Sequence, residues 1–258
     1  MLPSFLIVGT MKGGTSALVR GVKQHPEVWT PGGKEMHFFD EHFDEGLDWY
    51  RQQFAEATPA AVIGEATPGY MYGEEVIDRM TRTLPQARFI AILRDPVDRA
   101  YSHYWHNVRR GRERLTFEQA LAAEPRVLDG GDPGRPRVHF AYLDRSRYFV
   151  QLRAIEDRVG RERMMVLDND DLRHRRAETL RGVWSFVGVD PTLGPVTEPA
   201  RPLIWYVRQR LSPRRRARAE PYPPIDPGLR KRLGIEMRDE VAALATWWGR
   251  DLSGWESF

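Results

Sequence analysis

One short segment near the start of the chain, Gly9-Thr-Met-Lys-Gly-Gly-Thr-Ser16, combines a lysine with glycines and hydroxyl side chains. Glycines let a backbone turn tightly with its N–H groups pointing inward, Lys12 adds a full positive charge, and Thr15 and Ser16 add hydroxyl donors. A helical pattern begins at Thr15, so the partial positive charge of a helix amino end adds to these groups. The segment predicts a cradle for phosphate or sulfate. The alternative is an ordinary strand-to-helix turn that Thr15 caps.

The order of residues in this loop differs from that of the common nucleotide-binding loop. A Walker A loop carries its lysine after the last glycine, whereas Lys12 precedes the glycine pair. The apolar run Ala91-Ile-Leu-Arg94 also ends in arginine where a magnesium-binding acid would stand. These features disfavour ATPases, GTPases and most P-loop kinases, and they leave an atypical nucleotide kinase or NTPase as one alternative.

Short apolar runs alternate with helical patterns and predict the elements that position these residues. The candidate strands are Phe5–Val8, Ala61–Ile63, Arg88–Leu93 and Met164–Leu167. Helical patterns cover residues 15–19, 74–84, 96–104, 116–123, 147–159, 176–187 and 228–248. Strands that alternate with helices indicate an α/β fold with a parallel sheet. Residues 129–136 and 197–227 lack such patterns, and each stretch is either a surface lid or a passive linker.

Composition narrows the class of protein. The chain has 258 residues, of which 41% are hydrophobic and 29% charged, and this excludes a disordered or fibrous protein. It has no cysteine, which excludes disulfides, thiolate zinc sites and cysteine nucleophiles. The first apolar run, Phe5–Val8, is too short to span a membrane or to form a signal core. We expect a cytoplasmic protein without a membrane span, and the oligomeric state stays open.

Three motifs occur in one order along the chain: Lys12-Gly-Gly-Thr-Ser-Ala-Leu18, Lys34-Glu-Met-His-Phe-Phe-Asp40 and Leu93-Arg-Asp-Pro-Val-Asp-Arg-Ala-Tyr-Ser102. Together they resemble the PAPS-dependent sulfotransferases, especially the heparan sulfate N- and 3-O-sulfotransferase branch and its bacterial relatives. The likeness is strong over residues 4–105. It implies a P-loop-like parallel sheet flanked by helices, in a single sulfotransferase domain over residues 1–258. The implied donor is 3′-phosphoadenosine-5′-phosphosulfate (PAPS), with PAP as product and no metal required.

The resemblance assigns the donor side of the reaction to two regions. The loop within residues 9–18 binds the 5′-phosphosulfate through Lys12, Gly13, Gly14, Thr15 and Ser16. Charge gathers on the bridging oxygen as it leaves, and a cation held there, Lys12, stabilises the transition state more than the ground state.

Residues 93–102 form the second region, in which Arg94 and Ser102 hold the 3′-phosphate. Arg94 follows a strand at the sheet edge where α/β proteins bind ligands, and its planar fork suits phosphate oxygens. The alternative is that Arg94 pairs with Asp95 or Asp98 and that Ser102 is a solvated helical serine.

Glu35 is the candidate general base, since an acceptor hydroxyl must lose its proton as it attacks sulfur. In an extended segment Glu35 and His37 share one face, with Met36 opposite. In the matching family motif the glutamate is the base, and the positions of His37 and Asp40 shape the acceptor site. His37 is the rival base. The alternative is that Glu35 pairs with Lys34 or Arg51 at the surface.

The acceptor is a small molecule or a glycan with a hydroxyl group, and the sequence does not identify it. Ala66 in Glu65-Ala-Thr-Pro-Gly-Tyr70 stands where heparan-type enzymes carry a lysine, which argues against a highly sulfated polysaccharide. Residues 106–147 and 197–222 are expected to line its pocket or to close over it. O-sulfonation is favoured over N-sulfonation because Glu35 can serve as a base for a hydroxyl.

Seven arginines and no acid lie between residues 201 and 218. The resemblance implies that a basic loop here closes over the nucleotide, which makes Arg218 a candidate and Trp205 or Tyr206 possible stacking partners for adenine. No nucleic-acid partner is expected. A non-catalytic anion- or nucleic-acid-binding protein that uses these arginines is the other alternative function.

Overall fold

The computed structural model of the protein describes residues 1–32, 35–58, 61–195 and 221–258. By their packing these residues form two compact units. The first holds the described residues of Met1–Arg94, Tyr148–Thr197 and Glu240–Asp251, and the second those of Asp95–Arg147, Glu198–Asp239 and Leu252–Phe258. Whether they act as one sulfotransferase domain over 1–258 stays a prediction.

The first unit is built on a five-stranded sheet in the order β2-β3-β1-β4-β5, in which every pairing is parallel. The strands are β1 (Phe5–Gly9), β2 (Val28–Trp29), β3 (Val62–Ala66), β4 (Arg88–Leu93) and β5 (Met164–Asp168). β1 and β4 are buried along almost their whole length, as expected of parallel strands covered on both faces. The α/β fold with a parallel sheet is therefore confirmed.

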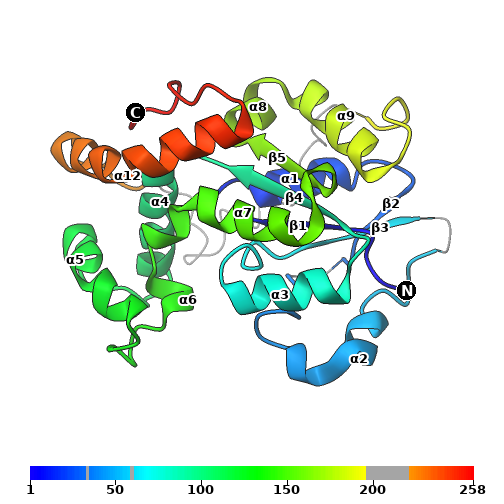
Figure 1. Cartoon of the computed structure of the whole chain (residues 1–258), viewed down its shortest axis with the longest axis horizontal. Coiled ribbons are helices and arrows are strands. Elements are labelled where there is room, and N and C mark those ends of the chain that lie inside the picture. Colours follow the sequence, from blue (N-terminus) through cyan, green and yellow to red (C-terminus); the bar gives the residue numbers. More distant parts are fainter. Residues whose placement is uncertain (33–34, 59–60, 196–220) are drawn as a thin grey trace, which may run out of the picture. The chain divides into compact units, whose positions relative to one another are not determined.

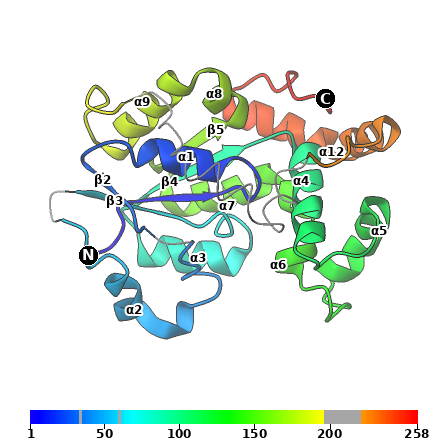
Figure 2. The same ribbon diagram turned by 180° about the vertical axis from the view of Figure 1, so that it is seen from behind.

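Helices cover both faces of this sheet. Those of the first unit are α1 (Thr15–Val22), α2 (Gly46–Gln52), α3 (Glu74–Thr83), α7 (Tyr148–Val159), α8 (Asn169–His174), α9 (Arg176–Val187) and the last part of α12 (Pro227–Trp248). α3 and α7 lie over one face (Figure 1), and α1 and α9 lie over the other (Figure 2). Buried side chains of α1 and α9, including Leu18, Val22, Leu180 and Trp184, form a core with Ile90 and Ile92 of β4.

The second unit is helical and begins directly after β4. It contains α4 (Pro96–Arg109), α5 (Phe117–Leu128), α6 (Arg137–Phe140) and the start of α12. The Asp95 carboxylate caps α4 by accepting the N–H groups of Val97 and Asp98, at 2.9 and 3.0 Å. Short 3₁₀ turns occur at Phe43–Glu45, Asp144–Ser146 and Arg161–Arg163.

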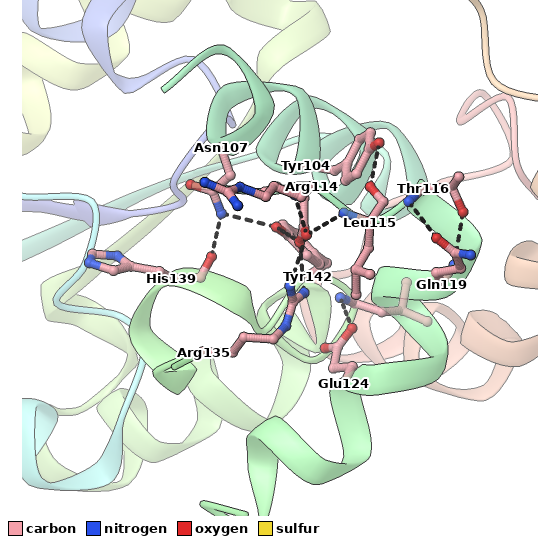
Figure 3. Close-up of polar contacts among 12 residues, drawn as sticks. Tyr104, Asn107, Arg114, Leu115, Thr116, Gln119, Glu124, Arg135, His139 and Tyr142 are labelled. Atoms are coloured by element: carbon pink, nitrogen blue, oxygen red, sulfur yellow. Dashed lines mark hydrogen bonds and ion pairs between the residues drawn. The ribbon is translucent and has the colours of Figure 1, made fainter. Parts of the chain in front are cut away.

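A buried carboxylate ties the irregular segment 129–136 to the second unit. Glu113, whose side chain is fully buried, accepts both guanidinium nitrogens of Arg135 at 2.8 and 2.6 Å and the Tyr142 hydroxyl at 2.8 Å. Figure 3 shows Arg135 and Tyr142 pointing toward one another. The segment is thus anchored at Arg135. The sequence did not indicate this anchor, because residues 129–136 have no helix or strand pattern. The longer range 106–147, which contains this segment, includes the end of α4 and the helices α5 and α6.

The strand order marks one edge of the sheet as the place for a ligand. From β1 the chain crosses to β2 and β3 on one side, and from β4 it continues to β5 on the other. In open parallel sheets the crevice at such a reversal, beyond the carboxyl ends of the strands, is the usual binding place. Here it lies at the ends of β1 and β4. Among the described residues no helix is both long and apolar enough to cross a bilayer.

Candidate functional site

The predicted phosphate loop joins β1 to α1 and lies against the end of β4. The Thr10 N–H donates to the Ile92 carbonyl at 2.9 Å, which fixes the loop to the neighbouring strand. Lys12 has φ 70° and Gly14 has φ 112°, so the backbone turns through the left-handed region twice. A positive φ is uncommon at a residue other than glycine and occurs preferentially at functional sites.

The glycine pair is required by close packing. A Cβ atom at Gly13 would overlap the Ile92 carbonyl oxygen, and one at Gly14 would overlap the side-chain amide of Asn169. That amide donates to the Gly13 carbonyl at 2.7 Å and thereby holds the loop from the end of β5. We did not single out Asn169 from the sequence, although a polar residue directly after a predicted strand was an available signal.

The amino end of α1 is open to an anion. Gly14 is the residue that precedes the helix, and no side chain in the described part of the chain caps it. The alternative in which Thr15 serves as the cap is therefore wrong, since Thr15 is the first residue of the helix itself. The first turn has no acidic residue and begins with the two hydroxyl-bearing residues Thr15 and Ser16.

A pocket of about 310 Å³ brings this helix end together with the predicted base. Thr15 and Ser16 line it, as do Glu35 and Met36. The remaining lining residues come from α1, from the segment after β2, and from β3 and its continuation: Val19, Arg20, Thr30, Pro31, Glu65, Ala66 and Pro68. The pocket thus has anion-binding groups and a carboxylate on the same surface, as sulfonate transfer to a hydroxyl would need.

Glu35 and Asp40 both bind the imidazole ring of His37. The Nε2 atom of His37 lies 3.2 Å from Oε2 of Glu35, and its Nδ1 atom lies 3.0 Å from Oδ2 of Asp40. The backbone here is not extended, because His37 has φ 52°, and Met36 lines the same pocket as Glu35. The two side chains therefore meet as predicted, but the strand geometry used to predict it was wrong.

The carboxylates around His37 change its chemistry. Hydrogen bonds to Asp40 and then to Glu35 raise the pKa of His37 to about 10, against an ordinary value of 6.5. A ring that keeps its proton at neutral pH cannot act as a general base, so the geometry favours Glu35 over His37 in that role. Arg51 binds Asp48 at 2.8 Å, which leaves the surface pairing of Glu35 with Arg51 without support.

His37, Asp40 and Glu41 each offer one possible metal ligand, and these atoms lie within 4.8 Å of one another. A metal would have to displace the proton that the raised pKa of His37 keeps on the ring. The expectation that no metal is required stays a prediction.

A second, buried carboxylate lies next to this segment. Glu65 in β3 is 2% exposed and accepts the hydroxyl groups of Thr67 at 2.8 Å, Tyr70 at 2.7 Å and Tyr50. Burial raises the pKa of Glu65, while the three hydroxyl donors act to lower it. We did not predict this cluster, although the polar residues of Glu65-Ala-Thr-Pro-Gly-Tyr70 directly after a run of strand residues were a visible signal.

A family model for sulfotransferases matches residues 49–192, which is more than half of the chain. The chain belongs to the sulfotransferase family. This sulfotransferase is similar over its whole length to a sulfotransferase from Alicyclobacillus acidocaldarius. The two are 28% identical, with a TM-score of 0.81 over 99% of each chain. The resemblance read from the three motifs is therefore confirmed.

Two curated relatives are longer proteins that match this chain over only part of their length. The membrane-associated sulfotransferase kil1 of Dictyostelium discoideum is 32% identical over 154 residues, which is 56% of this chain and 33% of that protein. Heparan sulfate glucosamine 3-O-sulfotransferase 5 of Mus musculus is 36% identical over 202 residues, 74% of this chain and 55% of the relative. The chain thus spans between a third and about half of their length. The expected cytoplasmic location stays a prediction.

The family excludes both alternative functions, the atypical nucleotide kinase or NTPase and the non-catalytic binding protein. The acids proposed as partners of Arg94 have other partners in the sulfotransferase. The Asp95 carboxylate caps α4 and accepts the backbone N–H of Ser257 at 2.9 Å, and Asp98 binds Arg230 at 2.6 Å. The alternative in which Arg94 pairs with Asp95 or Asp98 stays a prediction.

The remaining predicted donor residues belong to separate parts of the chain. Arg94 follows β4 in the first unit, where the Tyr148 hydroxyl donates to its carbonyl at 3.0 Å. Ser102 is buried in α4 of the second unit, so it is not a solvated serine. Arg218, Trp205, Tyr206 and Lys34 lie outside the described residues, as does most of the segment 197–222.

Proposed function

We propose that this sulfotransferase moves a sulfonate group from PAPS to a hydroxyl group of a carbohydrate or secondary metabolite, with Glu35 as the general base. The observation that carries the proposal is the shared pocket, lined by Thr15 and Ser16 at the open amino end of α1 and by Glu35. PAPS supplies an activated sulfonate with PAP as the leaving group. PAPS is the general donor of the family.

The loop fits the 5′-phosphosulfate in its donor set and in its shape. Its glycine pair lets the loop turn tightly against β4 and Asn169, with Gly14 directly before the amino end of α1. Lys12 would supply the cation for the oxygen that leaves with PAP, where negative charge grows toward the transition state. Arg94 and Ser102 would bind the 3′-phosphate, which distinguishes PAP from ADP. Arg218 is a further candidate for the nucleotide.

Glu35 would take the proton as the acceptor oxygen forms its bond to sulfur and the bond from sulfur to the bridging oxygen breaks. The protonated ring of His37, itself held by Asp40, orients the Glu35 carboxylate. Two relatives named for the 3-O-sulfation of heparan glucosamine support a glycan acceptor. Ala66, which lines the pocket where heparan-type enzymes carry a lysine, argues for an acceptor of lower negative charge.

The proposal is tested by Glu35→Gln, which keeps the side-chain size and one acceptor oxygen but cannot take a proton. Transfer of ³⁵S from labelled PAPS to a panel of glucosamine oligosaccharides and simple phenols should fall by about 10²–10⁴-fold. PAP should still raise the melting temperature as in the wild type, and more than ADP does at equal concentration without magnesium. Arg51→Gln, next to the segment but bound to Asp48, is the matched control.

Two results would contradict the proposal. Unchanged turnover of Glu35→Gln on an accepted substrate would remove Glu35 as the base. Equal stabilisation by PAP and ADP would remove the 3′-phosphate site.

A further inference from the structure

Glu65 is a buried acid whose charge is not required by the reaction described above. It lies inside β3, and its partners among the described residues are three hydroxyl groups. Thr67 and Tyr70 both donate to Oε1, and Tyr50 donates to Oε2. Burying a carboxylate in this way is costly, and such groups in native proteins usually have a reason that packing alone does not give.

The direction of these hydrogen bonds determines what the hydroxyl groups can do next. A hydroxyl has one proton, and Thr67 and Tyr70 donate theirs to Glu65. Their oxygens can then only accept. The Tyr70 oxygen accepts the backbone N–H of Phe38 at 2.7 Å, and the Thr67 oxygen accepts those of Met36 at 3.1 Å and His37 at 3.4 Å.

Three consecutive N–H groups, those of residues 36–38, are therefore bound by two hydroxyls whose orientation Glu65 sets. The middle residue, His37, has φ 52°, a strained conformation for a residue other than glycine that persists only where the surroundings hold it. His37 in turn contacts Glu35 at 3.2 Å. The chain of contacts runs from the buried carboxylate through two hydroxyls and the backbone to the proposed base.

We propose that Glu65 is a positioning residue that holds the 36–38 backbone, through the Thr67 and Tyr70 hydroxyls, so that His37 and Glu35 keep their arrangement. The proposal rests on the proposed function for its effect on turnover, but its structural part does not. A hydroxyl that donates its one proton to Glu65 cannot donate it to another group. The carboxylate therefore selects the hydroxyl orientation in which the oxygen accepts the backbone N–H groups.

Tyr50 supplies a matched control within the same cluster. Its hydroxyl donates to the other oxygen of Glu65, and its ring stacks on Phe38 with centroids 4.2 Å apart and planes 7° apart. Tyr50→Phe keeps that ring and leaves the acceptors of residues 36–38 in place. Tyr70→Phe also keeps its ring, which packs edge-on against Phe39 at 5.0 Å, but removes the acceptor for the Phe38 N–H.

The experiment compares Tyr70→Phe and Thr67→Val with Tyr50→Phe in the full-length protein, with Thr67→Ser as the conservative rescue. Two-dimensional ¹H–¹⁵N spectra of ¹⁵N-histidine-labelled protein report on the His37 ring, which is assigned by its loss in His37→Gln. Labelled PAPS and an accepted glucosamine oligosaccharide give turnover, and titration with PAP gives nucleotide affinity.

We expect the His37 ring signals to move in Tyr70→Phe and Thr67→Val but to stay in place in Tyr50→Phe and Thr67→Ser. Turnover should fall by about 10–100-fold in the first pair, as a small misplacement of a reacting group can cost this much, with PAP affinity within about twofold of the wild type. Equal changes in Tyr50→Phe and Tyr70→Phe, or an unmoved His37 signal in Tyr70→Phe, would overturn the proposal.

The two proposals fail in different ways. If Glu35→Gln keeps its turnover while Tyr70→Phe still moves the His37 signals, the general-base proposal is wrong and the positioning of the segment stands. If Glu35→Gln is inactive and the His37 signals do not respond to Tyr70→Phe, the base is supported and the positioning role of Glu65 is wrong.

Discussion

Glu65 in the first unit and Glu113 in the second are buried carboxylates with opposite electrostatic behaviour. Burial acts to raise the pKa of both groups. For Glu65 it prevails, and the pKa is raised. For Glu113 the hydrogen bonds from Arg135, the Leu115 N–H and Tyr142 outweigh it, and the pKa is lowered. The difference comes from the partners, since Glu113 has a guanidinium and Glu65 has hydroxyl groups.

The comparison shows what each kind of partner allows. A guanidinium has only donors and neutralises the carboxylate that it binds, as in the anchor that Arg135 gives to residues 129–136. A hydroxyl compensates the charge less well but keeps lone pairs for a third group. At Glu65 that third group is the backbone of the segment carrying the proposed base. Glu113 also has one hydroxyl partner, Tyr142, whose oxygen accepts the Asn107 amide at 3.1 Å. The two acids therefore differ in the guanidinium, and in what the hydroxyl groups hold, which at Glu65 is the backbone of residues 36–38.

The largest effect is expected for Arg135→Met, which leaves the Glu113 charge buried without its cation. The free energy of unfolding should fall by about 3 kcal/mol, since breaking one side of a buried ion pair strands the other. Urea unfolding measures it. Arg137→Met is the control, because Arg137 is more than half exposed and its pair with Asp144 should contribute less than about 1 kcal/mol. Equal losses for the two variants would contradict the comparison.

The next largest effect is expected on the stability of Glu113→Gln and Glu65→Gln and on how that stability depends on pH. Glu113→Gln should cost about 2 kcal/mol because it weakens charge-assisted hydrogen bonds, and Glu65→Gln should cost less because a neutral amide avoids the burial of a charge. A lowered pKa means that the stability due to Glu113 is present above its ordinary pKa of 4.5 and is lost as pH falls through the folded value.

The raised pKa of Glu65 has the opposite effect on how stability depends on pH. Above the ordinary pKa of 4.5 the folded state keeps the Glu65 proton longer than the unfolded state, so stability falls as pH rises toward the folded pKa. We would measure the urea midpoint of unfolding from about pH 3 to about pH 8. Its dependence on pH should become flatter at acid pH in Glu113→Gln and at neutral pH in Glu65→Gln. The same slope change in both variants would show that their partners do not set the difference.

The smallest effect is expected at His37, in the segment that Glu65 holds, and it concerns how the melting temperature depends on pH. The pKa of His37 is raised to about 10, so the folded state keeps this proton and gains stability that is complete below the ordinary pKa of 6.5. That stability is lost as pH rises toward 10. His37→Gln should remove this alkaline slope from the melting temperature. An unchanged slope would show that the ring is not held in its charged form.

The sequence predicted the parts of the fold that depend on local pattern. The apolar runs predicted β1 and β4 to within one residue, and the helix patterns predicted α3, α7, α9 and α12 equally well. β2 was missed, since its two residues, Val28 and Trp29, are too few for a pattern, and so were the short helices α2 and α8. Each of these elements is too short to show a hydrophobic period, although α8 has a local signal in its Asp168 cap and the acids of its first turn.

The site divides in the same way. The loop was predicted from its glycines, its lysine and its place before a helix, and Glu35, His37 and Asp40 were predicted from the resemblance of their motif to that of the family. The Glu65 cluster was not, because the bonds from Met36 to Thr67 and from Phe38 to Tyr70 join residues about 30 positions apart. Such contacts depend on which segments the folded chain brings together, and a single sequence does not contain that information.

The bond from the Asn169 amide to the Gly13 carbonyl joins residues 156 positions apart. Its donor lies directly after β5, which pairs with β4 and is the last strand among the described residues. The bond that holds the first loop therefore cannot form until nearly two thirds of the residues have been synthesised and β5 has docked. Contacts of such sequence separation form late because the chain entropy lost in closing them must be overcome first. A nucleotide bound to this loop should accordingly slow unfolding far more than it accelerates folding.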